Sequence, residues 1–129
     1  MSAPEFSNPD NMAAPVAAYS QCARVTAGSE LIFLAGQVGL RPDGSLPPTI
    51  GEQAAQTFAN VVRALEANGL TTANLVKINT YVVQGQPVAE IRAARQTALG
   101  DARPASTMIY VPALVDPKFL IEVEAVFAR

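Results

Sequence analysis

The sequence predicts a single α+β domain in which two helices cover one face of one sheet. A chain of 129 residues suits one hydrophobic core. The predicted elements follow the order β-β-α-β-α-β-β, and both helical segments are apolar along one side only. Strands at 31–35 and 75–83 are apolar on both faces, so two helices leave one face uncovered. Another copy of the chain is the expected cover, and a charged fraction of only 16% fits burial in an oligomer.

The first part of the chain is predicted to be an N-terminal arm, and residues 19–129 are predicted to form the domain. Residues 1–18 are rich in Pro, Ala and Ser and lack the basic start and apolar centre of a signal peptide. No apolar run approaches the roughly 18 residues of a membrane span. The β-rich runs at 23–25 and 31–36, joined by a Gly-Ser turn, predict a hairpin.

A first helix is predicted between Thr49 and Gly69. Thr49 and Glu52 have the spacing of a capping box, and Gly69 is a typical residue at a helix C-terminus. At helical spacing the inner face comprises Ala54, Phe58, Val61, Val62 and Leu65. The solvated face is predicted to comprise Glu52, Gln53, Gln56, Asn60, Arg63 and Glu66.

The second half of the chain predicts a strand, a helix and two further strands. A strand at 75–83 precedes Pro87, which suits the first turn of a helix at roughly 88–99 that Gly100 ends. Its inner stripe is predicted to be Val88, Ile91, Ala94, Ala98 and Leu99. Arg92 and Arg95 are most simply placed on its solvated face. Strands at 106–111 and 119–127 complete the predicted sheet.

Composition argues against several classes of site. The net charge of −2 provides no basic stripe, so no nucleic-acid partner is expected. The chain has no histidine, which excludes a Ser-His-Asp triad, and one cysteine, Cys22, so neither a zinc nor a copper site is expected. Because Cys22 cannot form an internal disulfide, we expect a reducing, cytoplasmic location. No membrane contact and no cofactor are expected.

Polar residues in two strands are candidates for chemistry. Glu122 and Glu124 are two residues apart in an otherwise apolar strand, so both point to one face. The two carboxylates either belong to a functional site, or lie at a solvated strand end or pair with Lys or Arg of a neighbour. Ser106 and Thr107 follow a rigid Arg-Pro corner at the mouth of a strand, where a small ligand can sit. Tyr19 either reaches a cleft or packs on the surface.

The chain resembles the RidA family, also called YjgF, over roughly residues 12–128. The resemblance is carried by an ordered set of segments: AAPVAAYSQ, LIFLAGQVGLRPDG, QTFANVVRALEANGL, VKINTYV, ARPAST and IEVEAV. It implies a chorismate-mutase-like fold, a homotrimer and ligand clefts between subunits. It also implies cofactor-independent hydrolysis of 2-imino or enamine acids to 2-keto acids and ammonia.

The family's site residues match this sequence only in part. The family's corner is Arg-Pro-Ala-Arg-Ser, and its second arginine clamps the substrate carboxylate through two parallel hydrogen bonds. Ser106 stands at that position here. By the resemblance, Glu122 matches the glutamate that positions the attacking water, and Tyr19 matches a pocket tyrosine. Arg92 stands where the enzymes usually have asparagine and is the candidate to replace the clamp, and Thr107 completes the predicted binding set.

Two classes of function remain open from the sequence. One is an imine or enamine hydrolase of the 2-iminoalkanoate deaminase type, weak or inactive on simple 2-imino acids because Ser106 cannot make a charged, bidentate contact. The other is a non-catalytic trimer that binds a metabolite or has a regulatory role. Some relatives have ribonuclease names, but the acidic charge and the aromatic content of 6% argue against an RNA substrate here.

Overall fold

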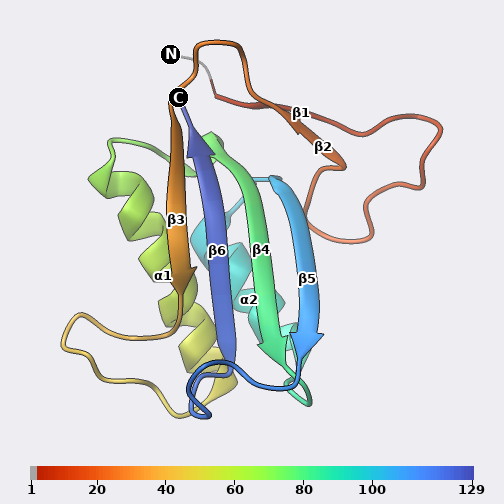
Figure 1. The fold of residues 1–129 in the computed structure, drawn as a ribbon. Helices are drawn as coiled ribbons and strands as arrows, with labels where there is room; N and C mark the ends of the chain where they lie inside the picture. Colours follow the sequence, from red (N-terminus) through yellow and green to blue (C-terminus); the bar gives the residue numbers. More distant parts are fainter. Residues whose placement is uncertain (1–2) are drawn as a thin grey trace.

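A computed structural model describes residues 3–129 and shows one mixed sheet with both helices on one face (Figure 1). The four strands lie in the order β3-β6-β4-β5, with β4 and β5 parallel and the other pairs antiparallel. The predicted α+β class is therefore confirmed. The main elements are β3 (Leu31–Gln37), α1 (Ile50–Ala67), a short 3-10 turn (Thr72–Asn74), β4 (Leu75–Val83), α2 (Val88–Leu99), β5 (Ala105–Val111) and β6 (Ile121–Ala128).

Local signals set the ends of both helices. The Thr49 hydroxyl accepts a hydrogen bond from the backbone N–H of Glu52 (3.3 Å) and donates one to its carboxylate (3.0 Å). After α1, Gly69 has a φ of +70°, and the Leu70 N–H bonds back to the carbonyl of Leu65. Gly100 ends α2 with a φ of +57°. The predicted bounds of α2, 88–99, are confirmed.

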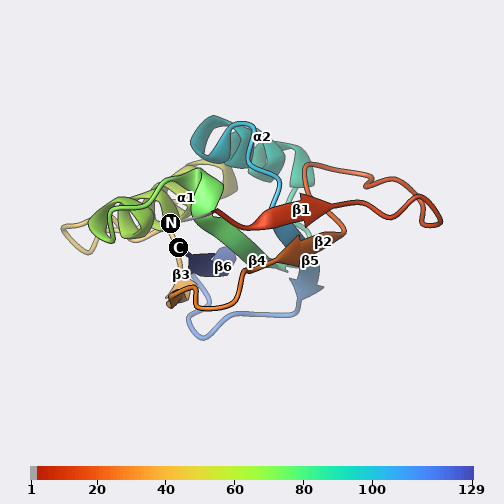
Figure 2. The ribbon, with the colours of Figure 1, turned by 90° about the horizontal axis from the view of Figure 1, so that it is seen from above.

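The core lies between the helices and one face of the sheet. Phe58 of α1, Ile78 of β4 and Phe127 of β6 have no exposed surface, and Ile91 of α2 is 2% exposed. Figure 2 shows the two helices on the same side of the strands. The other face of the sheet carries exposed apolar side chains, and Phe33 on it is 74% exposed. The predicted uncovered apolar face is therefore present in the single chain.

The predicted hairpin between residues 23–25 and 31–36 is wrong. The strand β2 (Cys22–Arg24) pairs instead with β1 (Glu5–Ser7) in the N-terminal arm, and an ion pair joins Arg24 to Glu5. The predicted arm is thus partly a strand, and β1 and β2 form a separate small ribbon (Figure 1). β3 pairs with β6, where its Ile32 and Leu34 pack against the core. Burial of these side chains outweighs the local pairing that the turn suggests.

Gln53 was predicted on the solvated face of α1, and this prediction is also wrong. Its side chain is 1% exposed and satisfied by three backbone groups from two loops. Its Nε2 donates to the carbonyls of Pro47 and Lys118 (both 3.0 Å), and its Oε1 accepts from the N–H of Leu120 (2.9 Å). Gln53 therefore fastens the segment before α1 to the segment before β6.

No helix within residues 3–129 is long and apolar enough to cross a membrane.

Replacing Gln53 with methionine is expected to lower stability by about 2–3 kcal/mol, because it leaves buried carbonyls and an N–H without partners while keeping the volume similar. Chemical denaturation followed by circular dichroism measures the change. Gln56→Met is the matched control, since Gln56 makes one hydrogen bond, to Asn60, at a part-buried position. Equal stability of the two variants would contradict the role assigned to Gln53.

Candidate functional site: a cavity beside helix α2 and the start of strand β5

The crossover from β4 through α2 to β5 brings the end of the helix beside the start of the strand. β4 and β5 are parallel, so α2 must run back between them, and only residues 100–104 separate it from β5. Arg103 stabilises this corner by donating from Nη1 to the carbonyls of Gly100 (3.1 Å) and Ala102 (2.9 Å). The last turns of α2 therefore face the first residues of β5.

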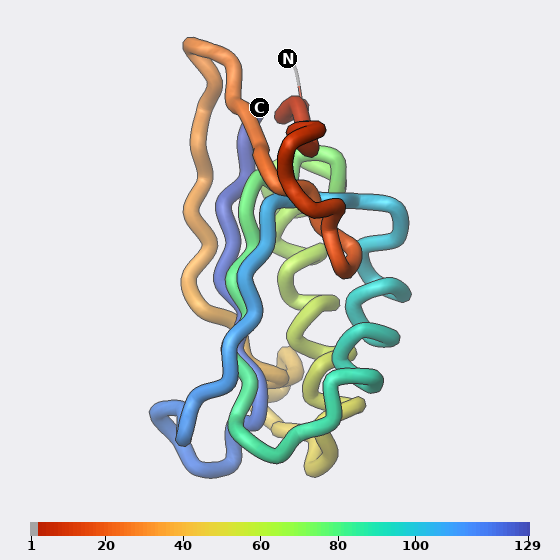
Figure 3. The backbone as a smooth tube through the Cα atoms, turned by 90° about the vertical axis from the view of Figure 1, so that its right-hand side faces the viewer, coloured from red at the N-terminus to blue at the C-terminus, as the bar shows by residue number. Residues whose placement is uncertain are grey.

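The N-terminal arm forms a third wall of this region. The Ser20 N–H donates to the carbonyl of Pro104 (3.1 Å), and Ser20 forms an isolated parallel bridge with Ala105. Figure 3 shows the arm lying beside the chain where it passes from α2 to β5. Tyr19 comes just before this contact, and its hydroxyl accepts from the N–H of Val16 (3.5 Å). Residues 16–19 are thus held next to the start of β5.

A cavity of about 700 Å³ lies among these three segments. Its lining includes three arginines, Arg92, Arg95 and Arg103, and no aspartate or glutamate. Ser106, Gln96, Thr80 and Tyr19 add neutral polar groups. The apolar part of the lining includes Phe58, Ile91, Leu99, Ala102 and Met108. The cavity therefore has a positive charge and suits an anionic ligand with an apolar portion.

Arg95 makes the closest polar contacts in the cavity. Its Nη1 donates to the Ser106 hydroxyl (3.0 Å), and its Nη2 donates to the carbonyl of Ala18 (2.6 Å). Burial lowers the pKa of Arg95, and the positive charge of Arg103 lowers it further. The prediction that Arg95 lies on a solvated face is therefore wrong. Arg92, the arginine predicted to replace the clamp, is exposed and lines the cavity without bonding to Ser106.

The position of Arg95 along α2 explains its burial. It follows Ile91 by four residues and precedes Leu99 by four, and these two are 2% and 3% exposed. Residues at this spacing share one face of a helix, so the stem of Arg95 lies along the buried stripe while its guanidinium extends to Ser106. The sequence analysis missed Arg95, although its spacing from Ile91 and Leu99 is the signal in the sequence that could have identified it.

The predicted site residues do not all lie in the cavity. Tyr19, Ser106 and Arg92 line it, but Glu122 lies on the opposite face of the sheet. Thr107 also lines the cavity, although its hydroxyl faces the other way and accepts from Lys77 Nζ (2.9 Å). Within one chain the sheet therefore separates the predicted catalytic carboxylate from the arginine-lined cavity.

The two carboxylates on the open face have different surroundings. Oε1 of Glu124 accepts from the Tyr81 hydroxyl (2.7 Å) and from Asn79 Nδ2 (3.1 Å). These hydrogen bonds, that from Tyr81 first, lower the pKa of Glu124. The same contact raises the pKa of Tyr81, with smaller contributions from burial and from the charges of Glu124 and Glu122. The Glu122 carboxylate has no hydrogen bond or ion pair to any residue in 3–129.

The glycines of the AGQVG segment make room for neighbouring groups. A Cβ at Gly36 would overlap the carboxylate of Glu122, and β3 has an irregular register at this point, between Leu34 and Gln37. A Cβ at Gly39 would come within 2.8 Å of the Gln53 carbonyl oxygen. The segment, residues 35–39, lacks the lysine of a phosphate-binding P-loop. Instead, Gly36 gives Glu122 its place on the open face.

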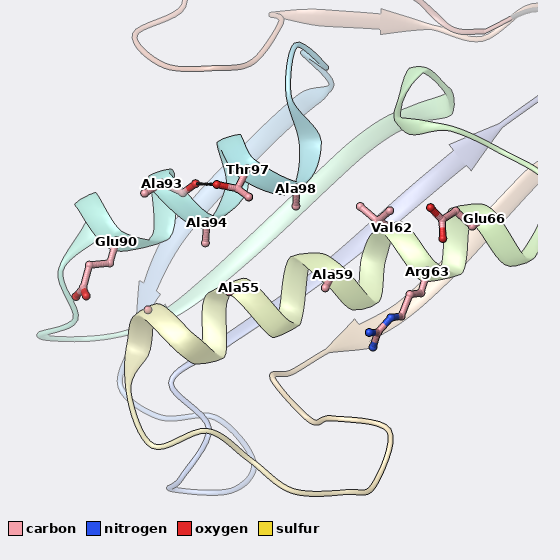
Figure 4. A pocket seen from close by; sticks show the side chains of 11 residues that line it. Ala55, Ala59, Val62, Arg63, Glu66, Glu90, Ala93, Ala94, Thr97 and Ala98 are labelled. Atoms are coloured by element: carbon pink, nitrogen blue, oxygen red, sulfur yellow. Dashed lines mark hydrogen bonds between the residues drawn. The ribbon is translucent and has the colours of Figure 1, made fainter.

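A second hollow, of about 640 Å³, lies between α1 and α2 (Figure 4). Five of the eleven residues that line it are alanines, which come from both helices. Its charged groups are Arg63, Glu66 and Glu90, and the Thr97 hydroxyl is already bonded to the carbonyl of Ala93 (3.1 Å). The cavity beside β5 offers more converging polar groups and is the stronger candidate site. No group of three or more His, Cys, Asp or Glu within 3–129 is placed to hold a metal ion.

Comparison with known proteins identifies the family. The model of the family described as Endoribonuclease L-PSP matches residues 10–128. The chain belongs to this family, which includes the RidA and YjgF proteins. It is 31% identical over 120 residues to the protein HMF1 of Saccharomyces cerevisiae, covering 90% of this chain and 88% of that one. The family assignment made from the sequence is confirmed.

Solved structures show the same fold over nearly the whole chain. A protein of unknown function of the Rid family, YyfB from Yersinia pestis, superposes with a TM-score of 0.88 at 30% identity, covering 99% of this chain and 100% of that one. The YjgF gene product of Escherichia coli gives a TM-score of 0.71 at 27% identity, with 97% and 98% covered. The predicted RidA-like fold is therefore confirmed.

One relative has a name that states an activity. The chain is 30% identical over 70 residues to a 2-iminobutanoate/2-iminopropanoate deaminase of Dermatophagoides farinae. The match covers 53% of this chain and 52% of that protein.

Replacing Tyr81 with phenylalanine is expected to raise the pKa of Glu124, because the variant removes the hydrogen bond that most favours the ionised carboxylate. Because the pKa of Glu124 is lower in the folded protein than in the unfolded chain, its carboxylate stabilises the fold at pH values above the unfolded-state pKa. This stabilisation is lost as the pH falls through the folded-state pKa. Carboxyl-carbon NMR titration measures the change. Tyr110→Phe is the control, since Tyr110 bonds to the Gln86 carbonyl instead. An unchanged Glu124 titration in Tyr81→Phe would contradict the assignment.

Proposed function

We propose that the protein hydrolyses a small imine or enamine acid to the corresponding keto acid and ammonia, with the ligand bound in the cavity beside α2. The observation that carries this proposal is the arginine-lined, carboxylate-free cavity at Ser106, where the family's substrate clamp stands. Membership of the family and the similarity to a named 2-imino acid deaminase support the reaction class. The net charge of −2 and the absence of histidine favour a small molecule over RNA.

The size of the cavity favours a substrate larger than the simplest 2-imino acids. Pockets of about 300–1,000 Å³ enclose drug-sized ligands, and the volume of about 700 Å³ falls in this range. A three-carbon acid fills only a small part of it. Ser106 is also much shorter than the family's arginine and leaves further space at the end of β5. We therefore propose weak activity on 2-iminopropanoate and better activity on acids with a longer apolar side chain.

The proposed reaction needs a base that the cavity of one chain does not contain. A base takes one proton from water as the water oxygen adds to the imine carbon, and this proton moves to the nitrogen to give a carbinolamine. The base then takes the hydroxyl proton and passes it to the nitrogen, so the carbonyl forms as ammonia leaves. Glu122 is the proposed base, because its carboxylate has no hydrogen-bond partner in the described chain and is matched with the family's water-positioning glutamate. Since the sheet separates it from the cavity, Glu122 of an adjacent copy must complete the site.

A homotrimer is the proposed assembly that brings the two halves together. Leu31 and Phe33 of β3 and Ile109 of β5 are exposed on the face of the sheet that bears Glu122, at 48%, 74% and 45%. Apolar side chains so exposed on one face favour its burial against another subunit. The resemblance to the RidA family implies the same assembly, with ligand clefts between subunits.

A non-catalytic binding protein is the alternative function. The observation in its favour is that the sheet separates Glu122 from the cavity within one chain. The polar groups that line the cavity are those of Arg, Ser, Thr, Tyr and Gln, and none of them is a ready general base. Assays with freshly generated 2-imino acids of increasing side-chain length distinguish the two. Ligand binding without turnover of any of them would favour the alternative.

The purified protein is expected to sediment as a trimer at micromolar concentration, and Phe33→Glu is expected to dissociate it by placing a charge in the apolar interface. Sedimentation velocity measures both. Ala55→Glu, on the exposed side of α1, is the control and should leave the assembly intact. A wild-type monomer would refute the shared-site arrangement.

Glu122→Gln is expected to keep the assembly and lower kcat by about 100-fold or more, because an amide cannot accept the proton from water. Turnover of a 2-imino acid with a branched side chain is the assay. Glu124→Gln is the control and should change kcat far less, since the carboxylate of Glu124 is already bonded to Tyr81 and Asn79. Unchanged kcat in Glu122→Gln would reduce Glu122 to an interface residue.

A further inference from the structure

The guanidinium of Arg95 is a positive charge without an anionic partner. Its two hydrogen bonds go to neutral oxygens, those of Ser106 and Ala18. The ion pairs within residues 3–129 are Arg24 with Glu5 and Arg129 with Glu30, and no acidic residue lines the cavity. A partly buried charge without a counter-ion is costly, so the cavity gains stability when an anion enters.

We propose that Arg95 anchors the ligand's carboxylate and replaces, from helix α2, the arginine that the family carries on the strand at the position of Ser106. The inference rests on the proposed function for the location of the site. The carboxylate-binding arginine of this chain is thus on α2 rather than on β5, and its guanidinium is held in place by the hydroxyl of Ser106. The sequence-based candidate for this role, Arg92, is replaced by Arg95.

The geometry leaves the guanidinium free to bind a carboxylate. An arginine has five N–H groups, and the bonds to Ser106 and Ala18 use one on each terminal nitrogen. The three that remain allow a two-point contact with a carboxylate without breaking either bond. The fixed contacts on both sides also hold the planar group in one orientation, which reduces the entropy lost on binding.

The other two arginines of the cavity are less suited to this role. Arg103 donates to two carbonyls of the corner before β5, so it maintains the wall. Arg92 is exposed, and a solvated guanidinium gains less from a carboxylate than a partly buried one. Arg95 is the one whose charge is both fixed and partly desolvated.

The position of Arg95 in the cavity also predicts the chemistry of the ligand beyond its carboxylate. With the carboxylate at Arg95, the remainder lies against the apolar lining formed by Phe58, Ile91, Leu99 and Met108. Thr80 is the one hydroxyl among the residues of β4 that line this part. The preferred ligand class is therefore a monocarboxylic 2-imino acid, or its 2-keto product, with a branched or longer apolar side chain.

The test is calorimetric titration of the wild-type protein with 4-methyl-2-oxopentanoate, a stable keto acid of this class, and with its uncharged methyl ester. Arg95→Gln is expected to weaken binding of the acid by about 10–100-fold and to leave binding of the ester almost unchanged, because only the acid uses the charge. A purely structural role for Arg95 would instead weaken both ligands. Arg63→Gln, at an exposed position on α1, is the matched control for net charge.

Three results would overturn the proposal: no binding of the acid by the wild type, equal loss of acid and ester binding in Arg95→Gln, or loss of acid binding in Arg92→Gln but not in Arg95→Gln. Turnover assays on the same variants separate this inference from the proposed function. Hydrolysis with an unchanged KM in Arg95→Gln refutes the anchor and leaves the hydrolase standing. Arg95-dependent binding without hydrolysis supports the anchor and refutes the hydrolase.

Discussion

The alternation of side chains along β6 is the constraint on which the rest of the structure depends. Ile121, Val123 and Phe127 are fully buried beneath the helices, so Glu122 and Glu124 must point to the other face. Shifting the strand by one residue would place two carboxylates in the core and remove its apolar side chains, each worth about 1.5–3 kcal/mol of burial. The glycine at position 36 follows from the same constraint, because it leaves room for the Glu122 carboxylate.

Elements with strong local signals were predictable from the sequence. Pro87 and Gly100 enclose α2, and Thr49 starts α1, because the conformations of proline, glycine and a capping hydroxyl act within a few residues. The partner of β2 was not predictable in this way. A Gly-Ser turn suggests a hairpin with β3, but the core side chains Ile32 and Leu34 place β3 beside β6, nearly a hundred residues away in the chain. Pairing over such a distance leaves no local pattern.

The candidate site was predictable only where the family motif applies. Tyr19 and Ser106 do line one cavity, as the resemblance implies, but the motif cannot show that Glu122 lies behind the sheet. Gln53 and Arg95 were missed for a common reason. Both are polar residues on helices, and a polar residue is assigned to the solvent by default. Their partners are backbone carbonyls of loops and a hydroxyl on another strand, which only the tertiary structure brings near.

The N-terminal arm forms one wall of the candidate site. The predicted boundary between residues 18 and 19 falls within the wall of the cavity, because Ala18 accepts from Arg95 and Ser20 is bridged to Ala105. The arm is in turn held by Asn8, whose side chain accepts from the Gln21 N–H (2.8 Å), and by the pairing of β1 with β2. The bond between Arg95 and Ala18 therefore joins the ligand's proposed anchor to the arm. Because Arg95 is bonded to Ala18 on one side and to Ser106 on the other, the arm and β5 together fix the orientation of the guanidinium, and with it the direction from which a carboxylate would approach the proposed anchor.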